Sequence, residues 1–225
     1  MRVPAPLPLS FPRSLLSSGG RVYGFNLSDD ILDRFESYFS LVSDWNTRMN
    51  LVSSRELVRF VEYHLLDSLK INSCFPLSSE GTFMDLGSGA GIPGIPLSLV
   101  RPGLNCTLVE SIAKKCRFLS TAVETLCLPH TTVLNTRVEE IDFSLDGSFD
   151  FIVTRATVNL HRFLTLSSRF LRPGGSLVSI KGDTINDELS VLRKKINDKL
   201  FHIDVRFPKA FESVRTGSIV VITKY

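Results

Sequence analysis

A glycine-rich turn between an apolar strand and a helix limits what this chain can fold into more than any other stretch of its sequence. The apolar run TFMDL occupies residues 82–86, and GSGAG follows directly at residues 87–91. Glycine adopts backbone conformations with positive φ and allows other groups to approach the main chain closely. Pro93 and Pro96 come next and suit the first turn of a helix, where a missing N–H does no harm. The sequence therefore predicts a strand, a tight turn and a helix that ends near Arg101.

Strands and helices alternate from this turn onwards. Further strands are predicted at residues 106–110, 132–134, 149–154, 176–180, 201–207 and 218–223. Helices are predicted at residues 113–126 and 183–200, and another ends at residue 171 before a turn at 172–175. Because no helical pattern separates the last two strands, we expect them to form an antiparallel pair at one edge of the sheet. The alternation is typical of an α/β domain, here residues 81–225, with a doubly wound, mostly parallel sheet and helices on both faces.

The first 80 residues carry a helical pattern instead. Apolar side chains repeat at helical spacing within residues 26–50, at Ile31, Phe35, Phe39, Val42 and Trp45. Ser53 and Glu56 have the spacing of a capping box, which begins a second helix. We therefore expect an N-terminal helical cap over residues 26–80. Residues 1–25 are expected to form an irregular leader and no signal peptide, because their prolines break helices: Pro4, Pro6, Pro8 and Pro12.

Composition and cysteine spacing exclude several classes of protein. Apolar residues make up 43% of the chain and charged residues 22%, as in globular proteins. The longest wholly apolar runs span about four residues, whereas a membrane-spanning helix needs about 20, so we expect no membrane association. The four cysteines have neither CxxC nor zinc-finger spacing, which argues against a metal site and favours reduced thiols in the cytoplasm. We expect the protein to be a monomer.

Two carboxylates accompany the glycine-rich turn. Asp85 precedes the glycines, and Glu110 ends the next predicted strand, where a carboxylate can hold the two hydroxyls of a ribose. The spacing Gly89-x-Gly91-x-x-Gly94 formally matches the dinucleotide-binding fingerprint. However, Asp85 would repel a pyrophosphate and would suit an ammonium or a sulfonium. We therefore expect an adenosine-containing ligand across the first two strands, and the alternative is a tight turn that binds nothing.

Several motifs resemble those of one known family. The segments FMDLGSGAGIPGIPL, RVEE, FDFIVTRA and RPGGSLVSIKG occur in this order, after WNTRMNLVSSRELVRFVEYHLLDSL. The glycine motif is similar to that of class I S-adenosylmethionine-dependent methyltransferases in general. The runs GIPGIPL, RVEE and TRA are more specific. They resemble the glucose-inhibited division protein B (RsmG) family, the small-subunit ribosomal RNA guanine-N(7) methyltransferases, over residues 30–182.

The resemblance implies a Rossmann-like class I methyltransferase fold and a set of cofactor contacts. Gly87 and Ile92 match family positions at the methionine and adenosine end of S-adenosylmethionine. Val138 and Glu139, within RVEE, match the pair that borders the adenine. Arg155, within TRA, matches the arginine at the face shared by cofactor and substrate.

Methyl transfer to the seven-position nitrogen of guanine needs no general base, because that nitrogen has a free lone pair and no proton at neutral pH. Catalysis then depends on in-line alignment and on a site that tolerates positive charge as it moves from sulfur to the base. Arg155 is the residue that we expect to position the reactants. His64 and Asp67, three residues apart, could form a proton relay or contact RNA, but a capping or surface pair is the favoured interpretation.

The C-terminal third of the chain is basic. Residues 151–225 contain 13 Lys and Arg against six Asp and Glu, although the whole chain carries a net charge of only +3. Arg162 and Arg169 are seven residues apart, which places them on one face of the predicted helix, and Lys181 follows a strand. We expect these three side chains to hold phosphates of small-subunit ribosomal RNA, free or in the ribosomal subunit, and the alternative is ordinary solvated side chains. The family usually has an arginine that runs almost directly into the last strand, whereas Arg215 is followed by Thr-Gly-Ser, so we assign it no role.

Three other functions remain open at this point. A class I methyltransferase could act on a small molecule or a protein, which the basic C-terminal third disfavours. A nicotinamide-dependent oxidoreductase would use a similar glycine turn, but Asp85 and the RPGG sequence oppose it. The third is a non-catalytic adenosine-binding module, and we expect calorimetry with the candidate cofactors to separate the first two classes from it.

Overall fold

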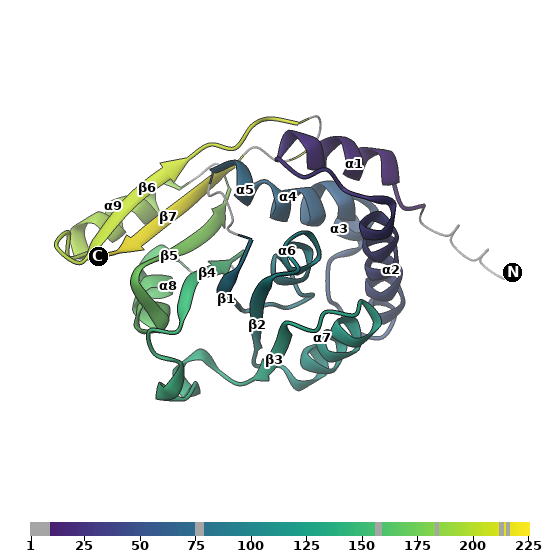
Figure 1. The fold of residues 1–225 in the computed structure, drawn as a ribbon. Coiled ribbons are helices and arrows are strands. Elements are labelled where there is room, and N and C mark those ends of the chain that lie inside the picture. The colour runs from purple at the N-terminus through teal and green to yellow at the C-terminus, as the bar shows by residue number, and fades with distance from the viewer. Residues whose placement is uncertain (1–9, 75–78, 156–158, 183–184, 212–213, 215–216) are drawn as a thin grey trace, which may run out of the picture.

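The computed structural model describes residues 10–74, 79–155, 159–182, 185–211, 214 and 217–225. Seven strands in this part of the chain form one sheet (Figure 1). They are β1 (Gly81–Leu86), β2 (Leu104–Glu110), β3 (Thr131–Asn135), β4 (Phe149–Thr154), β5 (Leu171–Lys181), β6 (Phe201–Arg206) and β7 (Ser218–Lys224). The α-helices are α1 (Arg13–Val22), α2 (Asp29–Asn46), α3 (Ser54–Val58), α4 (Leu66–Leu69), α5 (Ile71–Cys74), α6 (Gly94–Val100), α7 (Ala113–Thr125), α8 (Leu160–Ser167) and α9 (Asn186–Lys195).

The sheet has the strand order β3-β2-β1-β4-β5-β7-β6. The first five strands in this order run parallel, whereas β7 is antiparallel to both β5 and β6. The prediction of a doubly wound, mostly parallel sheet is confirmed, and so is the antiparallel pair at one edge. The edge strand itself is β6, and β7 lies one position inside it.

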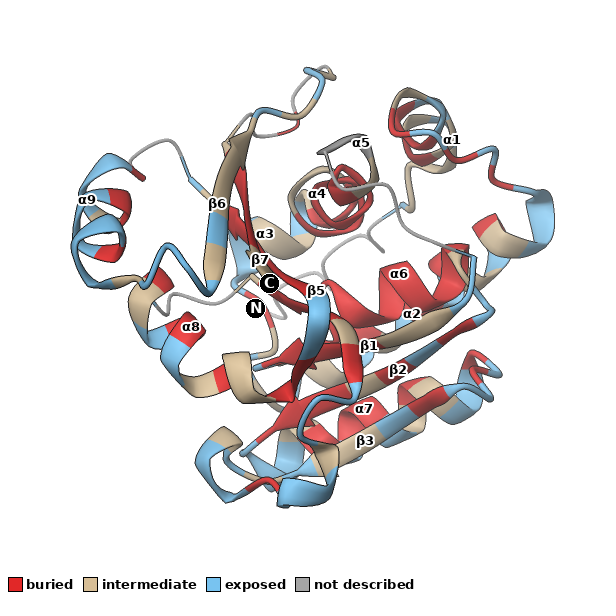
Figure 2. Ribbon diagram, turned by 60° about the vertical axis from the view of Figure 1, so that its left-hand side comes forward, coloured by how far each residue is buried: buried red, intermediate tan, exposed pale blue. Residues whose placement is uncertain are grey.

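Helices cover both faces of the sheet, and the strand side chains alternate between them. Phe83 and Phe151 pack in one hydrophobic cluster with the cap, α6 and α7. Their chain neighbours Met84 and Ile152 pack in a second cluster with α8 and α9. Figure 2 shows the resulting layers: the central strands are buried between helices, α6 is buried throughout, and β6 at the edge is only partly buried. The period of two between the faces is the one that extended chain imposes.

Side-chain hydrogen bonds begin two helices of the cap. The Ser28 side chain accepts from the N–H of Ile31 at the start of α2. The capping box is confirmed at α3, where Ser53 and Glu56 exchange side-chain and backbone hydrogen bonds. A π-helical turn, η1 (Val61–Leu65), and α4 continue the chain towards the sheet. The cap and the sheet share one hydrophobic cluster.

The expected irregular leader is wrong for residues 13–22, which form α1. Pro12 occupies the position just before this helix, where its missing N–H costs nothing. Gly19 lets α1 pack closely on the cap, because a Cβ there would lie 2.5 Å from Leu66 Cδ2. Arg13 also forms ion pairs with acidic side chains of α2. Residues 1–9 of the predicted leader lie outside the described residues.

The segment that leads into β5 differs from its prediction. The helix expected to end at residue 171 ends at Ser167, and a 3₁₀ turn, η4 (Ser168–Phe170), follows. The RPGG sequence, predicted as a separate turn, is part of β5 itself. The pairing of β4 with β5 shifts register between Phe149 and Phe151, and Gly174 has a φ of +78°. The glycines therefore bend an irregular first part of the strand instead of separating it from the helix.

The predicted helix at residues 183–200 is shorter than expected. It is described as α9, from Asn186 to Lys195, while residues 183–184 lie outside the described residues. Its last turn carries Arg193, Lys194 and Lys195, which suit the negative end of the helix dipole. The chain then turns into β6 at Phe201.

Candidate active site

The glycine-rich turn connects β1 to α6 at the edge where the parallel strands end. Gly87, Gly89 and Gly91 have φ values of +76°, +57° and +84°, in the left-handed region that favours glycine. The N–H groups of Gly87 and Ser88 donate to the carbonyl oxygen of Val109, at 2.9 and 3.0 Å, and tie the turn to β2. A Cβ built at Gly89 would meet only the carbonyl oxygen of Gly87, at an ordinary contact distance of 3.8 Å. A ligand can therefore approach the main chain at Gly89.

Asp85 is fully buried in β1 below this turn. Its Oδ2 accepts a hydrogen bond of 3.0 Å from the N–H of Gly94 at the start of α6. Its Oδ1 has no hydrogen-bond partner among the described residues. Burial raises the pKa of Asp85 to about 7, with a further contribution from the charge of Glu110, while hydrogen bonds from Gly94 and Ser88 oppose the rise. An unsatisfied buried acceptor of this kind fits a cationic hydrogen-bond donor.

Glu110 ends β2 and is 7% exposed. Its Oε2 accepts from the N–H of Gly89 at 3.1 Å, and its Oε1 accepts from the N–H of Ile112 at 2.9 Å. Both oxygens are thus fixed by main-chain donors, and each keeps a second lone pair. A carboxylate held in this way can accept hydrogen bonds from two neighbouring hydroxyls. The sequence predicted the place of Glu110 but not its bond to the turn.

Three further residues expected near the cofactor lie in or beside the same edge. Ile92 is buried within the glycine-rich turn. Val138 and Glu139 lie in the 3₁₀ turn η2 (Val138–Glu140), shortly after β3 ends. Val138 packs against the second hydrophobic cluster. Glu139 is exposed and lies 3.8 Å from Arg162 of α8, measured between Oε1 and Nη2.

Arg155 directly follows β4, as predicted, and its side chain is 18% exposed. Its Nε lies 2.8 Å from Oδ2 of Asp67 in α4. Its Nη1 donates a short hydrogen bond to Nδ1 of His64 in η1. The strand end that carries Arg155 is therefore joined to the helical cap.

The favoured interpretation of His64 and Asp67 as a capping or surface pair is wrong, because both residues are 3% exposed. Asp67 lies between two cations, Arg155 and Lys70, and its Oδ1 is 2.5 Å from the Lys70 Nζ. Lys70 is itself 1% exposed. Sequence reasoning missed Lys70, and the only available signal was its helical spacing of three residues from Asp67.

Tyr38 is a second residue that sequence reasoning missed. It is fully buried on α2, and its hydroxyl donates a short hydrogen bond to the carbonyl oxygen of Ala90 in the glycine-rich turn. Burial raises its pKa well above the usual value, the charge of Asp85 raises it further, and Arg155 lowers it. The apolar periodicity of the helix could have shown that Tyr38 is buried, but not which loop its hydroxyl reaches.

The three basic residues expected to bind phosphate have different surroundings. Arg162 has a side chain that is 66% exposed. Arg169 is not on the same helix, since α8 ends before it, so the predicted two-turn stripe is wrong. Its guanidinium donates to Asp146 and to the carbonyl oxygen of Ile141, at 2.7 and 2.6 Å. Lys181 is 8% exposed and lies 2.9 Å from Glu188.

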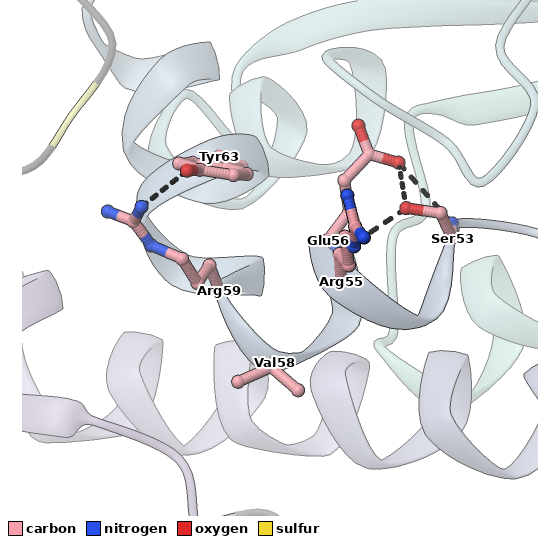
Figure 3. Close-up of a pocket in the computed structure, with 6 residues that line it drawn as sticks. All are labelled: Ser53, Arg55, Glu56, Val58, Arg59 and Tyr63. Atoms are coloured by element: carbon pink, nitrogen blue, oxygen red, sulfur yellow. Dashed lines mark hydrogen bonds between the residues drawn. The ribbon is translucent and has the colours of Figure 1, made fainter.

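A hollow of about 680 Å³ lies on the surface of the cap (Figure 3). Its lining consists of Ser53, Arg55, Glu56, Val58, Arg59 and Tyr63. The Arg59 guanidinium lies 4.2 Å from the centre of the Tyr63 ring and also bonds its hydroxyl. Arginine and tyrosine side chains are those that RNA-binding surfaces use for phosphates and stacked bases.

The described residues contain neither a membrane-spanning helix nor a metal-binding cluster. None of their helices is long and apolar enough to cross a bilayer. Their His, Cys, Asp and Glu side chains include no group of three or more that could hold a metal ion. Arg215, to which we assign no role, lies outside the described residues.

Residues 31–213 match the protein family GidB, described as rRNA small subunit methyltransferase G. Curated proteins named Ribosomal RNA small subunit methyltransferase G are among the relatives. One from Halorhodospira halophila is 34% identical over 84% of this chain and 88% of its own length. Another, from Xanthomonas campestris pv. campestris, is 39% identical over 69% of this chain and 71% of its own length.

Solved structures share the fold at low sequence identity. The tRNA methyltransferase TrmI from Aquifex aeolicus aligns with a TM-score of 0.55 and 14% identity, over 71% of this chain and 68% of its own. A predicted O-methyltransferase from Agrobacterium tumefaciens aligns with a TM-score of 0.55 and 15% identity, over 70% and 79%. At these identities the likeness concerns the fold alone, and it is the class I methyltransferase fold expected from the sequence.

Proposed function

Since this chain belongs to the GidB family of small-subunit ribosomal RNA methyltransferases, we propose that it transfers a methyl group from S-adenosylmethionine to the seven-position nitrogen of a guanine in small-subunit (16S) ribosomal RNA. The match to the family over most of the chain is the observation that carries this proposal. A cytoplasmic monomer that acts on the RNA or on the ribosomal subunit is the form in which we expect it to work.

The residues at the carboxyl edge of the sheet fit S-adenosylmethionine. Oδ1 of Asp85 is a buried acceptor that lacks a partner among the described residues, and a cationic ammonium would satisfy it. Glu110 offers two fixed carboxylate oxygens for the ribose hydroxyls. No atom lies closer than 3.8 Å to a Cβ position at Gly89, so a ligand can lie against the main chain there. Ile92 and Val138 would supply apolar contacts and Glu139 would border the adenine.

When bound, S-adenosylmethionine supplies a methyl group made electrophilic by the adjacent sulfonium. The chain needs no general base, since the attacking nitrogen carries no proton at neutral pH. Its residues act by holding the guanine in line with the methyl group, and a well-oriented pair of reactants reacts much faster than two free molecules. Arg155 can contribute to this alignment by donating to the six-position oxygen of guanine, to a flanking phosphate or to the cofactor carboxylate.

Contacts with RNA are proposed from the exposed basic residues. Of the three expected phosphate contacts, Arg162 is the strongest candidate. Its guanidinium is exposed, and its acidic partner Glu139 is 3.8 Å away. Arg169 and Lys181 are weaker candidates, because each is already held by protein acceptors. Arg55 and Arg59 of the cap hollow add a second basic surface.

The proposal is tested by mapping methylated guanines in 16S ribosomal RNA from cells with and without the gene. Chain scission at seven-methylguanine reports each modified position. We expect one site to lose its methylation in the disrupted strain and to regain it with the wild-type gene, but not with Glu110→Ala. An unchanged methylation map would refute the proposal. Methyl transfer to a small molecule or protein, or calorimetric binding of NAD instead of S-adenosylmethionine, would support an alternative.

A further inference from the structure

Asp67 places a buried negative charge between the cap and the end of β4. It is 3% exposed, and its two oxygens contact different cations: Oδ2 contacts Nε of Arg155 at 2.8 Å, and Oδ1 contacts Nζ of Lys70 at 2.5 Å. A buried carboxylate must be paired, because its desolvation is costly. The burial of Asp67 therefore explains why a cation lies beside it. It does not explain why one of its two cations is Arg155, the arginine at the end of β4.

Two contacts fix the orientation of the Arg155 guanidinium. Oδ2 of Asp67 pairs with Nε, and Nδ1 of His64 accepts a hydrogen bond from Nη1. Because arginine stays protonated and only donates, Nδ1 of His64 must be the acceptor, so its proton lies on Nε2. Contacts at two different nitrogens of one planar group define both its position and its plane. The N–H groups of Nη2 have no partner within the described part of the chain.

We propose that Asp67 is a positioning residue for methyl transfer, which holds the Arg155 guanidinium so that its Nη2 donors stay available to the guanine or the cofactor. The inference rests on the proposed function. His64 assists at Nη1, and Lys70 keeps the second oxygen of Asp67 in place. The helical cap thus takes part in aligning the reactants.

A double-mutant cycle tests whether Asp67 acts through Arg155. We expect Asp67→Asn to lower kcat for 16S RNA methylation at least tenfold while the dissociation constant for S-adenosylmethionine changes less than threefold. Arg155→Lys keeps a cation but loses the planar fork, and it should cause a similar loss. Adding Asp67→Asn to Arg155→Lys should then change kcat less than twofold. Multiplicative losses in the double variant would overturn the proposal.

A neighbouring substitution separates positioning from helix stability. Ser68 is fully buried in the same helix, and its hydroxyl donates to the carbonyl oxygen of His64 at 2.6 Å. Ser68→Ala should lower the Tm and leave kcat within twofold of the wild type. If Ser68→Ala reduces kcat as much as Asp67→Asn at an equal loss of Tm, Asp67 has only a structural role.

A second pair of variants keeps the test informative if Asp67→Asn does not fold. His64→Gln can still offer an oxygen to Nη1, whereas His64→Leu cannot. We expect the glutamine variant to retain kcat within threefold and the leucine variant to lose at least tenfold. Equal activities of the two would contradict the proposed orientation of Arg155.

One readout does not depend on methylation. In the ¹⁵N-labelled full-length protein, the Nε–H signal of Arg155 should be shifted and protected from exchange, and Asp67→Asn should remove both effects, because Asp67 is the partner of Nε. An unchanged signal overturns the positioning role even if the enzyme is active. A protected signal in a wild-type protein that methylates no RNA would refute the proposed function and leave the contact itself established.

Discussion

The Asp85 carboxyl has an unusual environment for a charged group, because it is fully buried and one oxygen lacks a partner among the described residues. Its pKa is raised to about 7, mainly by burial. A raised pKa means that the folded state holds the proton more tightly than the unfolded state. The stabilising contribution is complete below about pH 4, where both states are protonated, and is lost as the pH rises through about 7.

We therefore predict that the free protein loses stability relative to Asp85→Asn as the pH rises from 5 to 7. The slope approaches about 1.4 kcal/mol per pH unit for one titrating group. Urea unfolding of both proteins at several pH values measures it. Parallel pH profiles for the two proteins would contradict the raised pKa.

Cofactor binding should also depend on the protonation of Asp85, but the affinity should rise with pH whereas the stability falls. A cationic cofactor prefers the ionised carboxylate, so its affinity should fall by up to about tenfold for each pH unit below 7. Binding at pH 7 should release a fraction of a proton, which calorimetry in buffers of different ionisation enthalpy detects. Asp85→Asn should show weaker binding and no proton release. Proton uptake by the wild type would be incompatible with this assignment.

Glu110→Ala should weaken S-adenosylmethionine binding much more than it slows the chemical step. Loss of a charge-assisted hydrogen bond costs about 1.5–3 kcal/mol, which corresponds to roughly a 10- to 150-fold change in Kd. The ribose lies away from the transferred methyl group, so the loss is similar in the ground and transition states. Titration and single-turnover rates at saturating cofactor measure the two effects.

Glu124→Ala, a substitution at an exposed position of α7, is the control. A large fall in the single-turnover rate of Glu110→Ala would argue against a role of Glu110 in cofactor binding alone.

At the scale of single residues, sequence reasoning located the side chains that follow parallel strands. Asp85, Glu110 and Arg155 lie where the strand pattern predicted them. Their partners could not be predicted in the same way, because Asp67 and His64 belong to a cap whose packing on β4 is set by contacts far apart in sequence. In the sequence, a buried polar pair and an exposed surface pair have the same helical spacing. Only their burial in the folded structure distinguishes them.

Among the structural elements, the glycine-rich turn and the start of α6 require glycine for two different reasons. Gly94 has no room for a side chain, because a Cβ would lie 2.3 Å from Leu108 Cδ2 and 2.8 Å from Asp85 Oδ2. Gly89 has room but a positive φ. Gly147 has a similar φ of +66° and nothing within 4 Å of a Cβ, so it is a matched control for backbone strain.

We predict that Gly94→Ala destabilises the fold by about 1–3 kcal/mol, since overpacking must move the start of α6. Gly89→Ala and Gly147→Ala should each cost about 1–2 kcal/mol, the strain of left-handed backbone for a residue with a Cβ. Cofactor affinity should fall at least tenfold for Gly89→Ala and stay unchanged for Gly147→Ala. Thermal melts and cofactor titrations check both parts, and equal affinities of these two variants would exclude a ligand at Gly89.

The observed bounds of helices and strands agree with the predicted ones where a capping motif or a clear apolar pattern marks the boundary. Ser53 and Glu56 begin α3 with the predicted capping box, and β4 has the predicted bounds. Helix α1 was not predicted, because prolines dominate the leader and the packing of Gly19 on Leu66 is a long-range contact. The RPGG sequence has the composition of a turn, yet pairing with β4 draws it into β5.

On the scale of the whole molecule, RNA binding should depend on salt through the exposed basic residues. Each lost phosphate contact lowers the slope of log affinity against log salt by about 0.7–0.9. Arg162→Ala should therefore flatten the slope and leave the Tm unchanged. Arg169→Ala should lower the Tm, because it leaves Asp146 and the Ile141 carbonyl without their donor, and should leave the slope unchanged. The reverse result would place the RNA surface at Arg169.

Helix α2 is joined by specific polar contacts to the turn before α6 and to the loop after α7. Arg34 donates to the carbonyl oxygens of Leu126 and Cys127, at 2.6 and 3.2 Å, where α7 ends. Tyr38 donates to Ala90 in the glycine-rich turn. For gene recombination, this means that the cap is not a portable module. A chimaera that takes its cap from one parent and its sheet from another has to keep the backbone conformation of these loops, because every acceptor is a main-chain carbonyl oxygen. Crossovers near residue 80 should therefore succeed only between parents whose two loops have the same length and conformation.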